Sequence, residues 1–110
     1  MGDLGAKTIK LNYKIVPKKC SIKKVIISKN RVTVRWSKSS SASGYEIIYA
    51  PNSKFSGRKC ITISNKKTLS KRITGLSHEK TYYIKVRAFK KVNGKKYYSP
   101  WSSIKKVKTK

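Results

Sequence analysis

The sequence predicts an all-β protein, either a sandwich of two packed sheets or a barrel. In several short segments apolar residues recur at every second position, the spacing that places alternate side chains on one face of a strand. Turn-forming residues separate these segments at intervals of about eight to twelve residues, which is typical of sandwiches and barrels. No segment longer than one turn shows the 3.6-residue period of an amphipathic helix.

The chain of 110 residues is long enough for one small domain with one core. Its hydrophobic content of 37% is compatible with folding and differs from that of disordered chains. Residues 1–5 read as a leader sequence outside the fold, without the hydrophobic run of a signal peptide. No apolar stretch approaches the length of a membrane span, so membrane insertion is not expected.

The first predicted strand covers residues 8–16, where every second residue is apolar, and it ends at Pro17. A second extended segment contains Ile22 and Val25. The clearest strand covers residues 32–36, in which valines and a tryptophan alternate with polar residues. A serine-rich loop follows it.

The next strand places Tyr45, Ile47 and Tyr49 toward the core, with Glu46 and Ile48 facing outward. It ends at a Pro-Asn-Ser sequence, which is typical of a turn. Two shorter strands are expected after it, and they cover residues 60–64 and residues 70–74, the latter anchored by Ile73.

The last two strands are predicted to form a hairpin. Residues 82–89 alternate between apolar and polar side chains, and Asn93-Gly94 supplies residues that tolerate positive φ in a tight turn. The chain then returns as a strand from Tyr97 onward.

Several ordered positions resemble the fibronectin type III pattern: Val32-Thr33-Val34-Arg35-Trp36, Gly44-Tyr45-Glu46-Ile47, and Leu76 followed six residues later by Tyr82. The resemblance covers residues 18–110 and implies a seven-stranded immunoglobulin-like β-sandwich. It implies that the Trp36 indole fills the core and that the Tyr82 hydroxyl bonds nearby backbone. Together with the alternation, it gives the expected core: Trp36, Tyr45, Ile47, Leu76, Tyr82, Ile84 and Val86.

Three segments, Gly44 to Tyr49, Thr81 to Ala88 and Asn93 to Ser102, are also similar to lysine-rich modules in large surface and secreted proteins of Gram-positive gut bacteria. This resemblance implies an extracellular location and a parent protein with further domains. It further implies that residues 6–17 are the remnant of a preceding immunoglobulin-like domain, which adds an extra N-terminal strand.

The sequence offers no residues for catalysis or for a metal or cofactor. His78 is the only histidine, and the carboxylates are limited to Asp3, Glu46 and Glu79. A triad, a zinc site, a calcium site and a glycosidase pair each need more such groups close together. Cys20 and Cys60 match no zinc spacing, and whether they form a single disulfide is left open.

The charge is exceptional, since 29 Lys and Arg against three acidic residues give a formal net charge of +26. The lysines are spread over every loop and every outward strand position, so they form a coat and not a stripe. We therefore expect salt-dependent attraction to anionic wall polymers, glycans or nucleic acid, without sequence-specific nucleic-acid recognition.

The most unusual local string is Tyr97-Tyr98-Ser99-Pro100-Trp101-Ser102. It is similar to the W-S-x-W-S string of cytokine-receptor modules, in which aromatic rings interleave with cations of the adjoining strand. By that resemblance Lys85 and Arg87 stack on Trp101 and Tyr98, giving a structural ladder. The alternative is a ligand platform for a sugar or a base.

These observations predict a monomeric, non-catalytic extracellular module that acts as a spacer or an adhesion domain of a bacterial surface or secreted protein. Its expected partners are neighbouring domains of the parent protein and, as a further option, anionic cell-wall polymers or glycans. The alternatives are a polyanion- or carbohydrate-binding module and an accessory domain of a secreted enzyme.

Overall fold

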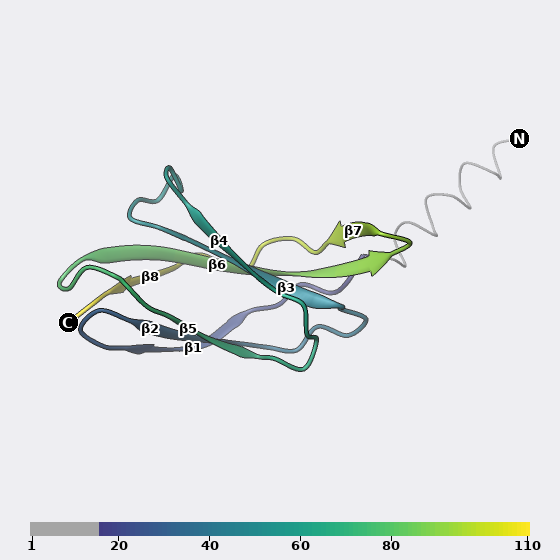
Figure 1. Cartoon of the computed structure of the whole chain (residues 1–110), viewed down its shortest axis with the longest axis horizontal. Coiled ribbons are helices and arrows are strands. Elements are labelled where there is room, and N and C mark those ends of the chain that lie inside the picture. The colour runs from purple at the N-terminus through teal and green to yellow at the C-terminus, as the bar shows by residue number, and fades with distance from the viewer. Residues whose placement is uncertain (1–15) are drawn as a thin grey trace, which may run out of the picture.

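A computed structural model describes residues 16–110, and these form two antiparallel sheets packed face to face (Figure 1). The predicted all-β sandwich is therefore confirmed, and the described residues contain no helix. The smaller sheet has the order β1 (Ile22–Ile27), β2 (Val32–Trp36) and β5 (Ser70–Ile73). The larger sheet has the order β4 (Lys59–Ile63), β3 (Gly44–Ala50), β6 (Thr81–Val92) and β7 (Lys95–Tyr98), with β8 (Lys105–Lys108) also pairing β6.

The predicted strand over residues 8–16 falls almost entirely outside the described part of the chain. Its role as an extra strand, and the assignment of residues 6–17 to a neighbouring domain, stay predictions. The returning strand after the hairpin differs from the expectation of one continuous element. The structure divides it into β7 and β8, so residues 16–110 form eight strands where the sequence predicted seven besides the N-terminal one.

The hairpin between β6 and β7 is confirmed. Val92 pairs with Lys95, so the turn consists of Asn93 and Gly94 alone. Their φ angles are 51° and 80°, as a two-residue turn that follows the sheet twist requires. This turn fixes the register in which Phe89 lies opposite Tyr98.

The main core lies between the two sheets and is centred on Trp36 and Tyr45, whose ring centroids are 5.5 Å apart. All seven residues expected in the core are buried. Burial of these aromatic and aliphatic side chains is the main favourable term in the stability of such a domain. The core also contains Cys20 and Val107, which lie in segments without a clear alternation.

The Tyr82 hydroxyl accepts a hydrogen bond from the backbone N–H of Ser77 at 2.9 Å. The bond ties the start of β6 to the loop that precedes it. It is the kind of corner that the spacing between Leu76 and Tyr82 implies.

The outward face of β3 differs from the simple expectation of a solvated surface. Glu46 and Ile48 do face away from the main core, but they are only 7% and 6% exposed. Ile48 belongs to a second cluster with Ala50 and Phe55, against which Tyr83 and Trp101 pack. The sequence predicted one core because the alternation of β3 does not reveal what covers its outer side.

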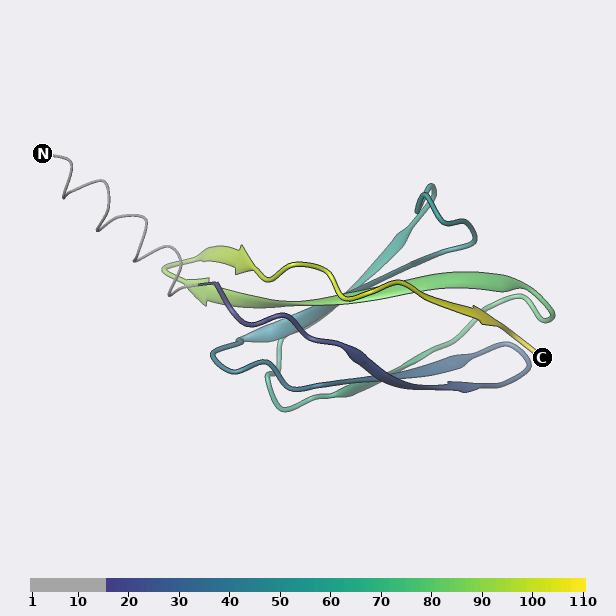
Figure 2. The same cartoon turned by 180° about the vertical axis from the view of Figure 1, so that it is seen from behind.

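The described chain enters and leaves the sandwich at opposite ends (Figures 1 and 2). Val16 and Pro17 lie beside the loop between β2 and β3, and beside Pro100. At the other end Lys110 donates its backbone N–H to Ser28 in the loop between β1 and β2, at 3.1 Å.

Candidate functional site: a ladder of cations and aromatic rings

Cationic and aromatic side chains alternate along the outer face of the larger sheet. The Arg87 guanidinium lies 3.6 Å from the ring centroid of Tyr98 and 4.2 Å from that of Trp101. The Lys85 ammonium lies 4.9 Å from the Trp101 centroid and 4.6 Å from that of Phe55. The resulting order is Tyr98, Arg87, Trp101, Lys85 and Phe55, and we call these five residues the ladder.

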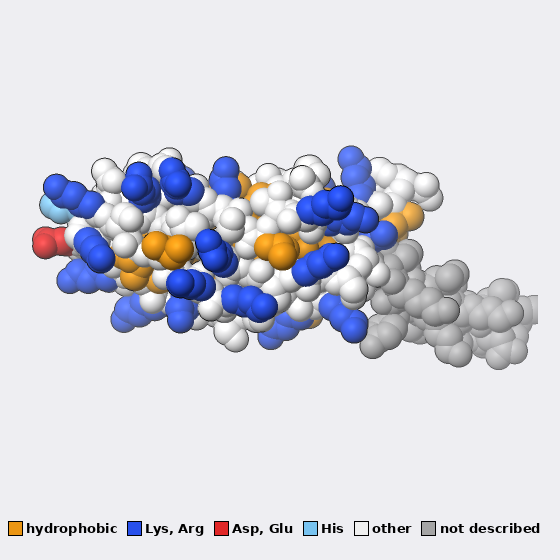
Figure 3. Space-filling model, turned by 90° about the horizontal axis from the view of Figure 1, so that it is seen from below, with side chains coloured by type: hydrophobic (Ala, Val, Ile, Leu, Met, Phe, Trp, Pro, Cys, Tyr) orange, Lys and Arg blue, Asp and Glu red, His pale blue; other side chains and the backbone are white. Residues whose placement is uncertain are grey.

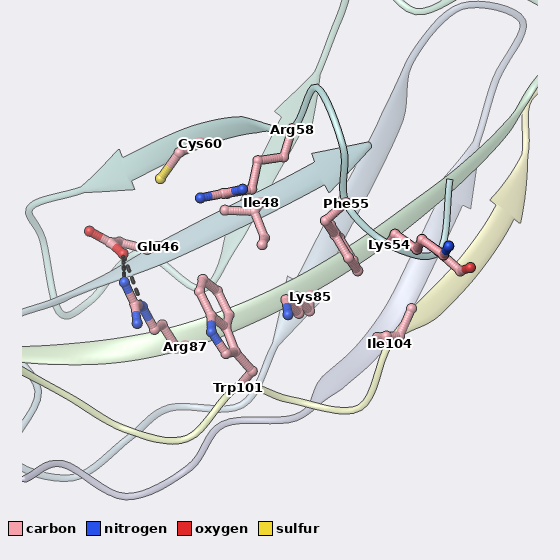
Figure 4. A pocket seen from close by; sticks show the side chains of 11 residues that line it. Glu46, Ile48, Lys54, Phe55, Arg58, Cys60, Lys85, Arg87, Trp101 and Ile104 are labelled. Carbon is pink, nitrogen blue, oxygen red and sulfur yellow. Dashed lines mark hydrogen bonds and ion pairs between the residues drawn. The ribbon is translucent and has the colours of Figure 1, made fainter. Parts of the chain in front are cut away.

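The spacing of β6 explains why one ring fits between two cations. Lys85 and Arg87 are two residues apart on one strand, so they share a face and are separated by about 6.7 Å. This distance corresponds to about two van der Waals layers, and Trp101 lies in the gap (Figure 4). Each exposed cation–π contact contributes about 0.5 to 1 kcal/mol.

Two serines hold the ladder segment against β6. The Ser99 hydroxyl accepts the Ala88 N–H at 2.9 Å, and the Ser102 hydroxyl accepts the Val86 N–H at 3.0 Å. The backbone N–H groups of both serines donate to the carbonyls of the same two residues. Residues 99–102, which we call the serine segment, thereby bond to the edge of β6 between the part that pairs with β7 and the part that pairs with β8.

This arrangement also explains why the returning strand is divided. Two residues, Pro100 and Trp101, lie between Ser99 and Ser102, whereas Arg87 alone lies between their partners Val86 and Ala88. The segment therefore carries one extra residue, as in a bulge. Side chains and not backbone groups accept the strand's N–H bonds there. Trp101 is consequently free to turn outward onto the cations.

Glu46 anchors the cationic side of the ladder. Its Oε1 atom accepts hydrogen bonds from Arg87 Nε at 3.0 Å and from Nη2 at 2.8 Å, and Lys96 Nζ lies 3.9 Å from Oε2. Glu46 and Arg87 are directly opposite each other in the pairing of β3 with β6. The ion pair holds the guanidinium flat between its two rings.

The structure brings together four of the five surface residues named from the sequence: Lys85, Arg87, Tyr98 and Trp101. Tyr97 lies apart from them, because it pairs with Lys90 and points to the opposite face of the sheet. Among the described cations it is Lys95 that lies over the Tyr97 ring, at 5.4 Å.

Phe55 is the ladder residue that the sequence reasoning missed. It belongs to the loop between β3 and β4, about thirty residues from Lys85, and no periodic pattern includes it. The loop turns inward there because Phe55 has a φ of 58°. A lone large apolar residue in a polar loop was the only available signal.

The two cysteines are free and lie in different surroundings. Cys20 is buried in the main core, whereas Cys60 is exposed on β4. Desolvation by burial raises the pKa of the Cys20 thiol to about 11, which suppresses its thiolate.

No group of three His, Cys, Asp or Glu side chains within residues 16–110 is placed to hold a metal ion. His78 and Glu79 are exposed in the loop between β5 and β6, whereas Glu46 is buried on β3. Residues 16–110 also contain no helix that is long and apolar enough to cross a bilayer.

The sheet topology and the ladder define the chain as an immunoglobulin-like sandwich module. The family model described as the fibronectin type III domain matches residues 17–105, so the chain belongs to the fibronectin type III family. Domains of this family are typically non-catalytic spacer or interaction modules, and they are typically extracellular.

Solved structures support the same fold. The crystal structure of the FN1-FN3 domains of chicken CNTN1 is 26% identical with a TM-score of 0.64, and the match covers 86% of this chain and 30% of that one. The solution structure of the fn3 domain of human contactin 1 is 20% identical with a TM-score of 0.68, covering 84% of this chain and 76% of that one. Among curated protein sequences none matches.

Proposed function

We propose that this domain is a non-catalytic spacer and adhesion module of an extracellular bacterial protein, either attached to the cell surface or secreted. The module separates neighbouring domains, and its cations attract anionic partners such as cell-wall polymers or acidic glycans. The observation that carries the proposal is that the described part of the chain, residues 16–110, begins and ends at opposite ends of the sandwich. The bacterial setting is supported by the resemblance of the lysine-rich segments described above.

The geometry suits a spacer. A strand as long as β6, with 12 residues, spans about 40 Å at roughly 3.4 Å per residue. Neighbouring domains attached at the two ends would be held apart by about this length. A compact sandwich resists shortening because its strands are cross-linked by backbone hydrogen bonds along their whole length.

The surface suits contact with anionic partners. In Figure 3 basic side chains are distributed over the described part of the visible face, without a single dominant patch. Within the described residues Glu46 and Glu79 are the only acidic side chains, and both ion pairs involve Glu46. Most cations therefore remain available to a polyanion.

A salt titration tests the adhesive part of the proposal. We expect the chain to bind poly(glycerol phosphate) and polygalacturonate, with an affinity that falls as sodium chloride is raised from about 0.05 M to 0.5 M. Neutral dextran is the matched polymer without charge. The adhesive part would be refuted if the chain bound neither anionic polymer near 0.15 M salt, or if its affinity did not change with salt concentration.

Small-angle scattering tests the spacer part. Two copies of the chain joined head to tail should form an extended particle with a maximum dimension about twice that of one copy. A compact particle of two copies side by side would contradict a spacer role, and +26 charges on each copy also oppose that arrangement.

The geometry favours a structural role for the ladder over a carbohydrate platform. Sugar stacking needs an open aromatic face, whereas Trp101 has Lys85 and Arg87 on its ring. An accessory domain of a secreted enzyme would use the same spacer geometry. In that case deleting the module should reduce the parent enzyme's activity on wall-bound substrate while leaving activity on soluble substrate intact.

A further inference from the structure

A hollow of about 700 Å³ opens beside the ladder, on the outer face of the larger sheet. It lies between the loop that contains Phe55, the start of β4, the middle of β6 and the segment around Trp101 (Figure 4). Four cations line it, from Lys54, Arg58, Lys85 and Arg87, against the single carboxylate of Glu46. We propose that this hollow binds one oxyanion group of an anionic polymer, namely a phosphate, sulfate or carboxylate.

The first argument is a local surplus of positive charge. Glu46 is already committed to Arg87 and faces Lys96 with its other oxygen. Within the described residues no acidic side chain forms an ion pair with Lys54, Arg58 or Lys85. These three cations line one hollow without a counter-charge of their own, so a bound anion would be attracted there.

The second argument is that the rim of the hollow is built by specific hydrogen bonds. Asn52 Oδ1 accepts the backbone N–H groups of Lys54 and Ser56, each at 3.1 Å, and Asn52 Nδ2 donates to the Ser56 carbonyl at 3.0 Å. These bonds fold the loop so that Phe55 packs inward on Ile48. The backbone that carries the Lys54 side chain is therefore fixed before any ligand arrives.

The third argument concerns the kind of ligand. The faces of Trp101 are covered by cations, so a sugar ring or a base has no open surface on which to stack. The buried Ile48 side chain lies in the floor and the exposed Ile104 at the edge, and the apolar floor reduces competition from water for a bound charge. The Arg58 guanidinium can donate two parallel hydrogen bonds to one oxyanion, which a lysine cannot do.

This inference rests on the proposed attraction to anionic polymers and adds a preferred place for it. A uniform coat binds equally through any of its cations. A built hollow makes Lys54 and Arg58 more important than cations of the same type elsewhere. Lys71 and Arg72 on β5 provide the matched comparison, since both are exposed and lie on the other sheet.

The experiment compares K54Q/R58Q with K71Q/R72Q, each of which removes one lysine and one arginine. Affinity for poly(glycerol phosphate) and for polygalacturonate is measured by titration calorimetry near 0.15 M salt. We expect K54Q/R58Q to lose about tenfold or more in affinity for at least one polymer, and K71Q/R72Q to lose about twofold or less. Comparing the phosphate polymer with the carboxylate polymer shows which of the two oxyanions the hollow binds.

A second measurement locates the ligand. Amide resonances of residues 53–60 and of Trp101 should shift on addition of inorganic phosphate or sulfate, and these shifts should be absent in K54Q/R58Q. An equal loss of polymer affinity in the two double variants would show that the hollow is not a preferred binding site, while leaving the adhesive function intact. Failure of the unaltered chain to bind either polymer would overturn both, so the two failures are distinguishable.

Discussion

The carboxylate of Glu46 accepts two hydrogen bonds from the guanidinium of Arg87, which itself lies between the rings of Tyr98 and Trp101. The two residues face each other across β3 and β6. One ion pair therefore connects the backbone register of the larger sheet to the ladder on its outer face. Replacing either partner should disturb both features.

Glu46→Gln should lower the free energy of unfolding by about 1 to 3 kcal/mol, because it weakens charge-assisted hydrogen bonds and leaves a half-buried guanidinium without its counter-charge. Urea unfolding followed by circular dichroism measures the change. Glu79→Gln is the control, since it removes the same charge from an exposed loop and should change stability by no more than about 0.5 kcal/mol. Equal effects of the two substitutions would show that only net charge matters.

Trp36→Ala should cost about 3 to 5 kcal/mol, because it leaves a large cavity between the sheets. Trp36→Phe should cost clearly less. Within residues 16–110 the buried Trp36 Nε1 atom has no hydrogen-bond partner, and phenylalanine removes this donor while keeping an aromatic ring. A Phe variant as unstable as the Ala variant would contradict this account; denaturant midpoints of both provide the comparison.

Ser102→Ala should lower stability by about 1 to 3 kcal/mol, because the buried Val86 N–H loses its only hydroxyl acceptor. Amide hydrogen exchange at Val86 should become faster than in the unaltered chain, whereas exchange at Ile47 on the neighbouring strand should change less. Ser103→Ala, at the exposed adjacent position, serves as the control. Unchanged protection of Val86 would mean that the serine segment does not complete the edge of β6.

Because the pKa of the Cys20 thiol is raised in the folded chain, we expect the free energy of unfolding to fall at alkaline pH. Its folded-state pKa is raised from 9.0 to about 11, so between these values the folded chain keeps a proton that the unfolded chain has released. Stability is therefore fully present below about pH 9 and falls as the pH rises toward 11. The urea midpoint at pH 8 and at pH 10.5 measures this loss.

Cys20→Ala is the control for the alkaline effect. The pKa of Tyr45 is also raised by burial, so the variant should keep the part of the pH dependence that comes from this phenol and lose the part that comes from the thiol. An identical pH dependence in the variant and the unaltered chain would exclude Cys20 as the cause.

Local periodicity was sufficient for much of the fold and for part of the candidate site. Two-residue spacing identified Lys85 and Arg87 as neighbours on one face, and the similarity of the Tyr98 to Ser102 string to a known pattern supplied their aromatic partners. Tyr97 was grouped with them because it is adjacent in sequence. In a strand adjacent residues point to opposite faces, and Tyr97 does so.

The sequence by itself determined the strands from β2 to the β6–β7 hairpin and most of the side chains that fill the space between the sheets, because alternation records the face on which each residue lies. Only the tertiary structure decided that Glu46 is buried against Arg87, that Phe55 closes the ladder and that Cys20 lies in the core. These features depend on strand register and on a loop folding back over a sheet. Both are set by packing between residues far apart in the chain, and periodicity within one strand carries no information about them.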